Sequence, residues 1–177
     1  VDDIEWRAAC EAGGLEATRD LVPALLDAHL VEPRPGGWRF CHQMMREAIR
    51  SSARMTGRWI RHNRACAEML EVLLGQPGLA ERLGRHRVEA EQFEDSLEPL
   101  LAAAREHLLA SRHASVEELV DLFEQSLVHI DTPTSDDRRG RAALARIRAR
   151  IGQGRFGSAG KLAARTAELA RKHRWRE

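Results

Sequence analysis

Residues 36–49 read GGWRFCHQMMREAI, in which a glycine turn, a short β-forming run and a histidine lead directly into an amphipathic helical pattern. The first backbone N–H groups of a helix have no partner within the helix, and that end carries partial positive charge. A histidine brought there by a strand adds a further donor for an anion. His42 is therefore a candidate phosphate-contacting residue. The alternative is that it caps the helix or lies in a small core, the commoner use of a lone histidine.

The residues before this stretch predict the layout of a winged helix. Apolar spacing indicates three short helices, over residues 5–12, about 16–20 and 20–30. Residues 31–33 and 38–40 then flank residues 34–37, whose proline and glycines suit a tight reversal. Three helices followed by a hairpin is the order expected of a winged-helix domain.

The rest of the chain is predicted to be almost wholly helical, from Gln43 to about Arg54, from Arg58 to Leu74, and again after a break at residues 75–78. A faint internal repeat relates residues 92–104 to residues 155–167, because an aromatic residue opens a helical pattern in each. Residues 115–123 are a candidate third copy, for which a generic helical bundle is an equal alternative. Helix pairs stacked into a short superhelical array explain the repeat, since one pair cannot bury its apolar face alone.

Composition limits the class of protein. The chain has 177 residues, of which 43% are hydrophobic and 31% charged, as in ordinary globular proteins. No apolar run approaches the roughly 20 residues needed to cross a bilayer. Because the first residue is Val1 and no signal-peptide pattern follows, we expect a piece of a longer polypeptide. Three widely spaced cysteines without a Cys-x-x-Cys pair predict free thiols in a reducing, cytoplasmic setting.

Charge is segregated along the chain, although the formal net charge is only +1. Residues 68–131 hold 14 acidic and 5 basic side chains, whereas residues 132–177 hold 13 basic and 4 acidic ones. Upstream, arginines recur every fourth residue and would form a basic ridge on an unbroken helix, at Arg46, Arg50, Arg54 and Arg58. Such surfaces bind nucleic-acid backbones or acidic proteins, or are simply solvated. Residues 20–29, the candidate recognition helix, carry two aspartates and no cation, which disfavours direct DNA readout.

Signatures of catalysis are missing from the sequence. It contains no phosphate-binding loop, no Gly-x-Ser-x-Gly elbow and no His-Glu-x-x-His pair. The histidines are isolated or fall on different sides of a helix, so no metal site is expected. We therefore expect no enzymatic activity and no cofactor held by this chain alone.

Residues 37–49, together with residues 64–70 and the helical repeats, resemble the region that follows the ATPase core in bacterial STAND-type signalling ATPases. In related switch ATPases this position belongs to a Met-His-Asp motif, whose histidine touches the β-phosphate of bound ADP and holds the inactive state. The resemblance assigns that contact to His42. Cys41 and Gln43 depart from the methionine and the aspartate of the motif.

The resemblance implies a mainly α fold with one small hairpin: a winged helix at residues 1–54, a connecting helix at 55–77 and an incomplete, right-handed tetratricopeptide-like array at 78–177. It implies a non-catalytic regulatory segment whose partners are its own upstream ATPase domain, which binds ADP or ATP, and a protein bound by the array. Many members also carry a serine/threonine kinase domain. Nucleic-acid and membrane binding are not expected. The alternatives are a nucleic-acid-binding adaptor that uses the basic helix and tail, and a structural helical domain.

Overall fold

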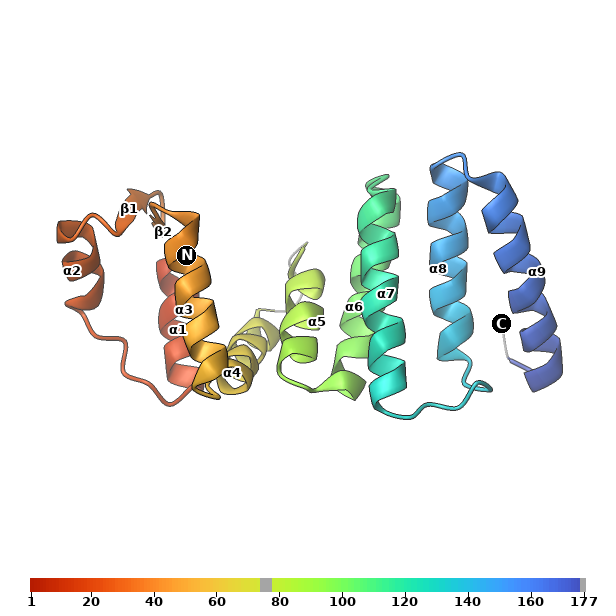
Figure 1. The fold of residues 1–177 in the computed structure, drawn as a ribbon, viewed down its shortest axis with the longest axis horizontal. Helices are drawn as coiled ribbons and strands as arrows, with labels where there is room; N and C mark the ends of the chain where they lie inside the picture. Colours follow the sequence, from red (N-terminus) through yellow and green to blue (C-terminus); the bar gives the residue numbers. More distant parts are fainter. Residues whose placement is uncertain (74–77, 176–177) are drawn as a thin grey trace. The chain divides into compact units, whose positions relative to one another are not determined.

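A computed structural model describes residues 1–73 and 78–175 and is mainly helical, with one two-stranded antiparallel sheet (Figure 1). The mainly α class with a single small hairpin is therefore confirmed. The chain divides into two compact units. The first contains residues 1–73 and 89–91, and the second contains the described residues of 74–88 and 92–177. Within the described residues, every helix is too short or too polar to span a bilayer.

The first unit combines a hairpin with four helices, α1 (Asp3–Ala12), α2 (Leu21–Asp27), α3 (Gln43–Met55) and α4 (Trp59–Val72). The strands β1 (Val31–Arg34) and β2 (Gly37–Phe40) pair with Val31 opposite Phe40. Trp38 is buried and meets the rings of Trp6 and Phe40 edge to face, with centroids 6.5 and 5.3 Å away. This aromatic cluster fixes the hairpin against α1.

Only two helices precede the hairpin, so the expectation of three was wrong. Residues 16–20 are not helical: Gly13 and Gly14 end α1, and the Thr18 carbonyl accepts a turn hydrogen bond from Leu21 N at 3.2 Å. Five residues are too few to offset the cost of nucleating a helix. The next helix, α2, is also shorter than expected, because His29 adopts a left-handed φ of 54° just beyond it.

The two helices expected downstream of the hairpin are present as α3 and α4. They are separated at Gly57, whose φ of 70° is incompatible with a continuous helix. α4 packs against α1 and buries Asn63, Ala65, Ala67, Met69 and Leu70. Leu74, the expected end of this helix, and the break at residues 75–77 lie outside the described residues.

The second unit is built from α5 (Leu79–Glu89), whose last residue belongs to the first unit, and from α6 (Phe93–Leu109), α7 (His113–His129), α8 (Arg138–Gly152) and α9 (Phe156–His173). From α6 onward, consecutive helices run antiparallel (Figure 1). Each packs against the next, and α6 also contacts α8. Leucine, valine and phenylalanine side chains from α6 and α7 form the core with alanines of α8: Leu97, Leu100, Leu101, Val116, Leu119, Val120, Phe123, Leu127, Ala142, Ala145 and Ala149.

The helix pairs α6–α7 and α8–α9 are joined by loops of the same kind. Ser111 and Gly154 occupy equivalent left-handed positions, with φ of 56° and 73°. The next residue in each loop donates its N–H to the carbonyl five residues earlier, Arg112 to His107 at 2.9 Å and Arg155 to Arg150 at 2.8 Å. The α5–α6 loop has the same turn, with Glu91 at a φ of 57° and Gln92 N donating to the Arg87 carbonyl at 2.9 Å. A right-handed, tetratricopeptide-like arrangement of these helices remains a proposal.

The repeat read from the sequence relates α6 to α9. Phe93 and Phe156 each begin a helix, as expected. Each helix follows a loop of the same kind, in which Gln92 N donates to the Arg87 carbonyl at 2.9 Å and Arg155 N donates to the Arg150 carbonyl at 2.8 Å. That these helices stack as repeats stays a prediction.

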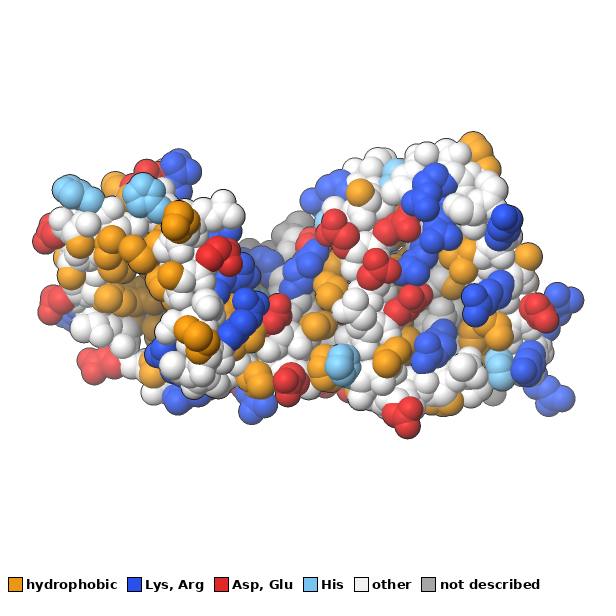
Figure 2. Space-filling view, in the orientation of Figure 1, with side chains coloured by type: hydrophobic (Ala, Val, Ile, Leu, Met, Phe, Trp, Pro, Cys, Tyr) orange, Lys and Arg blue, Asp and Glu red, His pale blue; other side chains and the backbone are white. Residues whose placement is uncertain are grey.

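The opposite charges of the two sequence blocks meet inside the second unit. Arg138 of α8 lies 2.6 Å from Glu94, and Arg141 lies 3.1 Å from Glu98, both on α6. Three acidic residues of α7 contact α8 in the same way, with Asp121 and Glu124 on Arg146 and Glu117 on Arg150. Figure 2 shows the red side chains over α7 beside the blue ones over α8. Much of the basic C-terminal block is therefore paired within the fold.

Candidate functional site

His42 lies between β2 and α3, in the N-cap position of α3. Its backbone is extended, with φ of −124° and ψ of 131°, and its side chain makes no capping hydrogen bond. The side chain is exposed. The imidazole therefore neither caps α3 nor lies in a core.

The start of α3 offers unpaired donors beside this histidine. Met45 N donates to the His42 carbonyl at 3.2 Å, but the N–H groups of Gln43 and Met44 have no partner within the described residues. A helix start with free N–H groups favours negative charge. His42 and the first turn of α3 consequently present donors from side chain and backbone together.

A cavity of about 330 Å³ opens at this helix start. It is lined by Val1, Arg39, Phe40, His42, Gln43 and Arg46. Two guanidinium groups and an imidazole with no acidic lining residue make the cavity suited to an anion.

The two arginines of the cavity are held by carboxylates outside it. The Arg39 Nε donates to Glu32 across the hairpin, and this hydrogen bond lowers the pKa of the Glu32 carboxyl. Arg46 lies 3.7 Å from Glu47. Since both pairs are largely exposed, they are weak and an anion could displace them.

The expected ridge of four arginines is broken by the end of α3. Arg46, Arg50 and Arg54 belong to α3, whereas Arg58 follows Gly57 and donates from its Nε to Thr56 Oγ1 at 2.9 Å. The unbroken helix that a continuous ridge requires is not formed, because Gly57 ends α3 before the fourth arginine.

Two of these arginines pack on a tryptophan that the sequence did not single out. The guanidinium carbons of Arg50 and Arg54 lie 5.6 and 4.2 Å from the Trp59 ring centroid. The Trp59 Nε1 donates to Glu89 at 2.6 Å, and Arg54 lies 3.9 Å from the same carboxylate. These cation–π and ionic contacts give Arg50 and Arg54 a structural role. The sequence signals this cluster only by arginines that recur every fourth residue, at positions 46, 50 and 54, shortly before Trp59.

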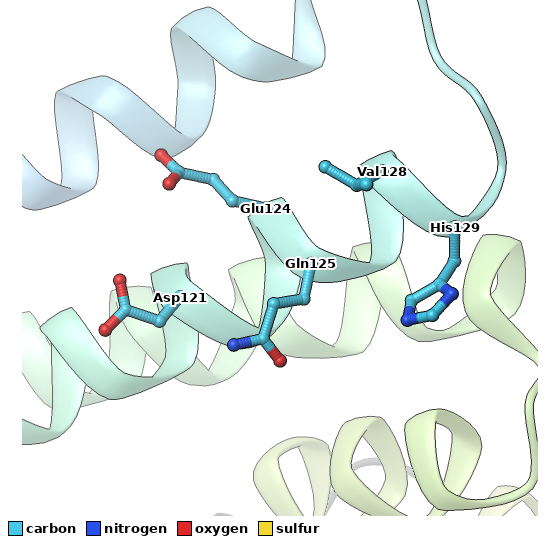
Figure 3. A pocket seen from close by; sticks show the side chains of 5 residues that line it. All are labelled: Asp121, Glu124, Gln125, Val128 and His129. Atoms are coloured by element: carbon cyan, nitrogen blue, oxygen red, sulfur yellow. The ribbon is translucent and has the colours of Figure 1, made fainter.

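A second cavity of about 360 Å³ lies on the surface of α7 (Figure 3). All five lining residues come from that helix: Asp121, Glu124, Gln125, Val128 and His129. In Figure 3, Gln125 and His129 point to one side of α7 and Glu124 to the other. Arg146 already holds Asp121 and Glu124, and the His129 ring stacks on Phe93 with centroids 4.2 Å apart. These contacts are structural, so this depression is the weaker candidate site.

Metal ligands are not gathered anywhere in residues 1–73 and 78–175, where no group of three or more histidine, cysteine or acidic side chains could hold an ion. No disulfide joins Cys10, Cys41 or Cys66, and burial raises the pKa of the Cys10 thiol. None of the three lies in the cavity beside His42.

No protein-family model, no curated protein and no solved structure matches this chain.

Proposed function

We propose that this chain is a non-catalytic regulatory segment of a STAND-type signalling ATPase. In this proposal residues 1–54, within the first unit, form a winged helix that contacts ADP held by an ATPase domain elsewhere in the same polypeptide. The second unit is a tetratricopeptide-like arm that binds a protein partner in the cytoplasm. Docking of the first unit on ADP holds an inactive state, and partner binding or exchange to ATP releases it.

The observation that carries this proposal is the exposed His42 at the open start of α3. His42, Gln43 and the two arginines Arg39 and Arg46 line one cavity at this helix start. This donor set fits a diphosphate, which presents several charged oxygens to one protein surface. The cavity lacks a phosphate-binding loop, in keeping with a sensor that contacts a nucleotide bound by another domain.

The test is the substitution His42→Ala in a polypeptide that contains both this chain and the proposed ATPase domain. Loss of one hydrogen bond to a charged group removes about 1.5–3 kcal/mol, so ADP should dissociate roughly 10- to 150-fold more readily. Basal signalling should rise. The matched control is Met44→Ala, because Met44 is 84% exposed and does not line the cavity.

Both the ADP dissociation rate and the melting temperature are measured on each variant. Faster ADP release by His42→Ala with an unchanged melting temperature supports the phosphate contact. Unchanged ADP release overturns the proposed switch, whatever the melting temperature does.

The alternative, a nucleic-acid-binding adaptor, has less support from the geometry. Arg50 and Arg54 pack on Trp59, and several arginines of α8 pair with carboxylates of α6 and α7. A phosphate backbone would have to compete with these internal partners.

A further inference from the structure

One face of α8 is left uncovered by its neighbours in the second unit. Its core face bears Ala142, Ala145 and Ala149, and Arg146 and Arg150 face α7. The uncovered face, here called the α8 stripe, consists of Arg141, Leu144, Arg148 and Ile151.

The α8 stripe repeats every seven residues, two turns of helix. Leu144 and Ile151 are seven residues apart and are 51% and 49% exposed. Arg141 and Arg148 are also seven apart and exposed. Apolar residues at this spacing with charged residues beside them are what one helix presents to another packed along it.

Two cavities flank the α8 stripe and share Arg141 and Leu144. The one between α8 and α9 has a volume of about 510 Å³ and an apolar wall of Leu144, Ile147, Ala163, Ala167 and Ala170, with the Trp175 ring at one end. The one between α6 and α8 has a volume of about 130 Å³ and includes Arg105 and Arg148. The small alanines of α9 would let a further helix approach closely.

Three of the four charged residues that line the two cavities are arginines, and Asp137 is the one acidic residue, so the charge of this surface favours an acidic partner. Arg105 and Arg148 have no acidic partner within the described residues, and Arg141 has only an exposed contact with Glu98. On its other side α8 already packs against an acidic helix, α7, whose Glu117 and Glu124 contact its arginines. The α8 stripe combines apolar residues at heptad spacing with arginines, so a second acidic helix would match it as α7 matches the other side of α8.

We propose that the α8 stripe binds an acidic amphipathic helix of a partner protein, an inference that rests on the proposed role of the second unit as a protein-binding arm. The partner's apolar residues pack along Leu144 and Ile151 and into the cavity between α8 and α9. Its flanking carboxylates pair with Arg105, Arg141 and Arg148. Burial of the apolar residues stabilises the complex, and the arginines select an acidic helix over a basic one.

The probe is a fluorescently labelled, end-blocked peptide of about three heptads, with leucine at a and d and glutamate at e and g. Repulsion between glutamates disfavours its self-association. A second peptide has glutamine in place of every glutamate. Binding to the full chain is followed by anisotropy, and we expect the glutamate peptide to bind at least about tenfold more tightly at low salt.

Three variants of the chain locate the binding surface. Leu144→Gln removes the apolar contact, and the double variant Arg105→Glu, Arg148→Glu reverses the charge. Each change should weaken binding of the glutamate peptide at least about tenfold. The double variant should instead bind a peptide with lysine at e and g, a rescue that a folding defect would not produce. The control Lys161→Glu, Arg165→Glu makes the same charge change at residues that line neither cavity and should alter binding less than about twofold.

Equal binding of the glutamate and glutamine peptides overturns the proposal. So does an equal loss of binding in the control variant, because the attraction would then be non-specific. The peptide experiment involves no nucleotide, so its outcome is independent of the His42 test. Selective peptide binding at the α8 stripe together with unchanged ADP release by His42→Ala supports the docking surface and overturns the nucleotide switch. Non-selective peptide binding together with faster ADP release by His42→Ala supports the switch and overturns the docking surface.

Discussion

Asp136 and Arg138 form a two-pronged ion pair at the start of α8. The Arg138 Nε lies 3.0 Å from Asp136 Oδ1, and its Nη2 lies 2.8 Å from Oδ2. The Arg138 backbone N–H also donates to Asp136 Oδ1 at 2.9 Å, so the same carboxylate satisfies a free donor of the helix. The hydrogen bonds from the Arg138 side chain lower the pKa of Asp136 below its usual value and raise that of Arg138.

Asp136→Asn should therefore destabilise the chain by about 1–2 kcal/mol at pH 7, because the charged acceptor is lost. A carboxyl whose pKa is lowered by folding contributes its stability above the unfolded pKa of about 3.9. That contribution disappears as pH falls through the lower folded pKa. The free energies of unfolding of wild type and variant should consequently converge in acid, as measured by urea denaturation between neutral pH and pH about 2.

Asp137→Asn is the matched control for that experiment. Asp137 is the N-cap residue of α8, yet its side chain makes no capping hydrogen bond. We expect a change within about 0.5 kcal/mol at every pH. A destabilisation equal to that of Asp136→Asn would refute the assignment of the cap to Asp136.

The equivalent loop positions Ser111 and Gly154 predict opposite effects of reciprocal substitutions. Ser111 adopts a left-handed φ of 56°, which strains a residue with a Cβ, so Ser111→Gly should stabilise the chain by about 1 kcal/mol. Gly154→Ser should destabilise it by a similar amount, because a Cβ meets the same penalty there. The melting temperatures of both variants test these opposite effects. If both variants shift the melting temperature in the same direction, the prediction is contradicted.

Packing predicts opposite outcomes for two helical glycines. A Cβ at Gly84 of α5 would lie 2.8 Å from the Leu100 Cδ2 and 3.1 Å from the Leu100 backbone N, so Gly84→Ala should cost about 1–3 kcal/mol. A Cβ at Gly160 of α9 would meet nothing within 4 Å, so Gly160→Ala should stabilise by about 0.5–1 kcal/mol. The free energy of unfolding of the two variants is measured by denaturant titration. Stabilisation by Gly84→Ala would show that α5 and α6 pack less closely than these distances indicate.

Nucleic-acid affinity should be weak, because many arginines already have internal partners. Titration with duplex and single-stranded oligonucleotides at physiological salt should give dissociation constants no tighter than about 10⁻⁶ M, the range of non-specific binding. Submicromolar binding with a steep salt dependence would instead favour the nucleic-acid adaptor.

The sequence by itself determined α3 and α4, the helical character of the rest of the chain, the hairpin and the placement of His42 before α3. These features depend on neighbours along the chain: helical periodicity, a Pro-Gly-Gly turn and the position of a histidine between a strand and a helix. Sequence reasoning failed at residues 16–20, where apolar spacing over five residues was too short to form a helix against the glycines before it.

Only the tertiary structure decided which distant groups meet. It placed Arg39 and Arg46 on one cavity with His42, and it put Arg50 and Arg54 on Trp59. It also paired the acidic block with the basic block, which the sequence left open to external partners, and it left the α8 stripe uncovered. Local patterns fix which face of a helix is apolar or charged. Which neighbour covers that face depends on how helices far apart in the sequence pack together.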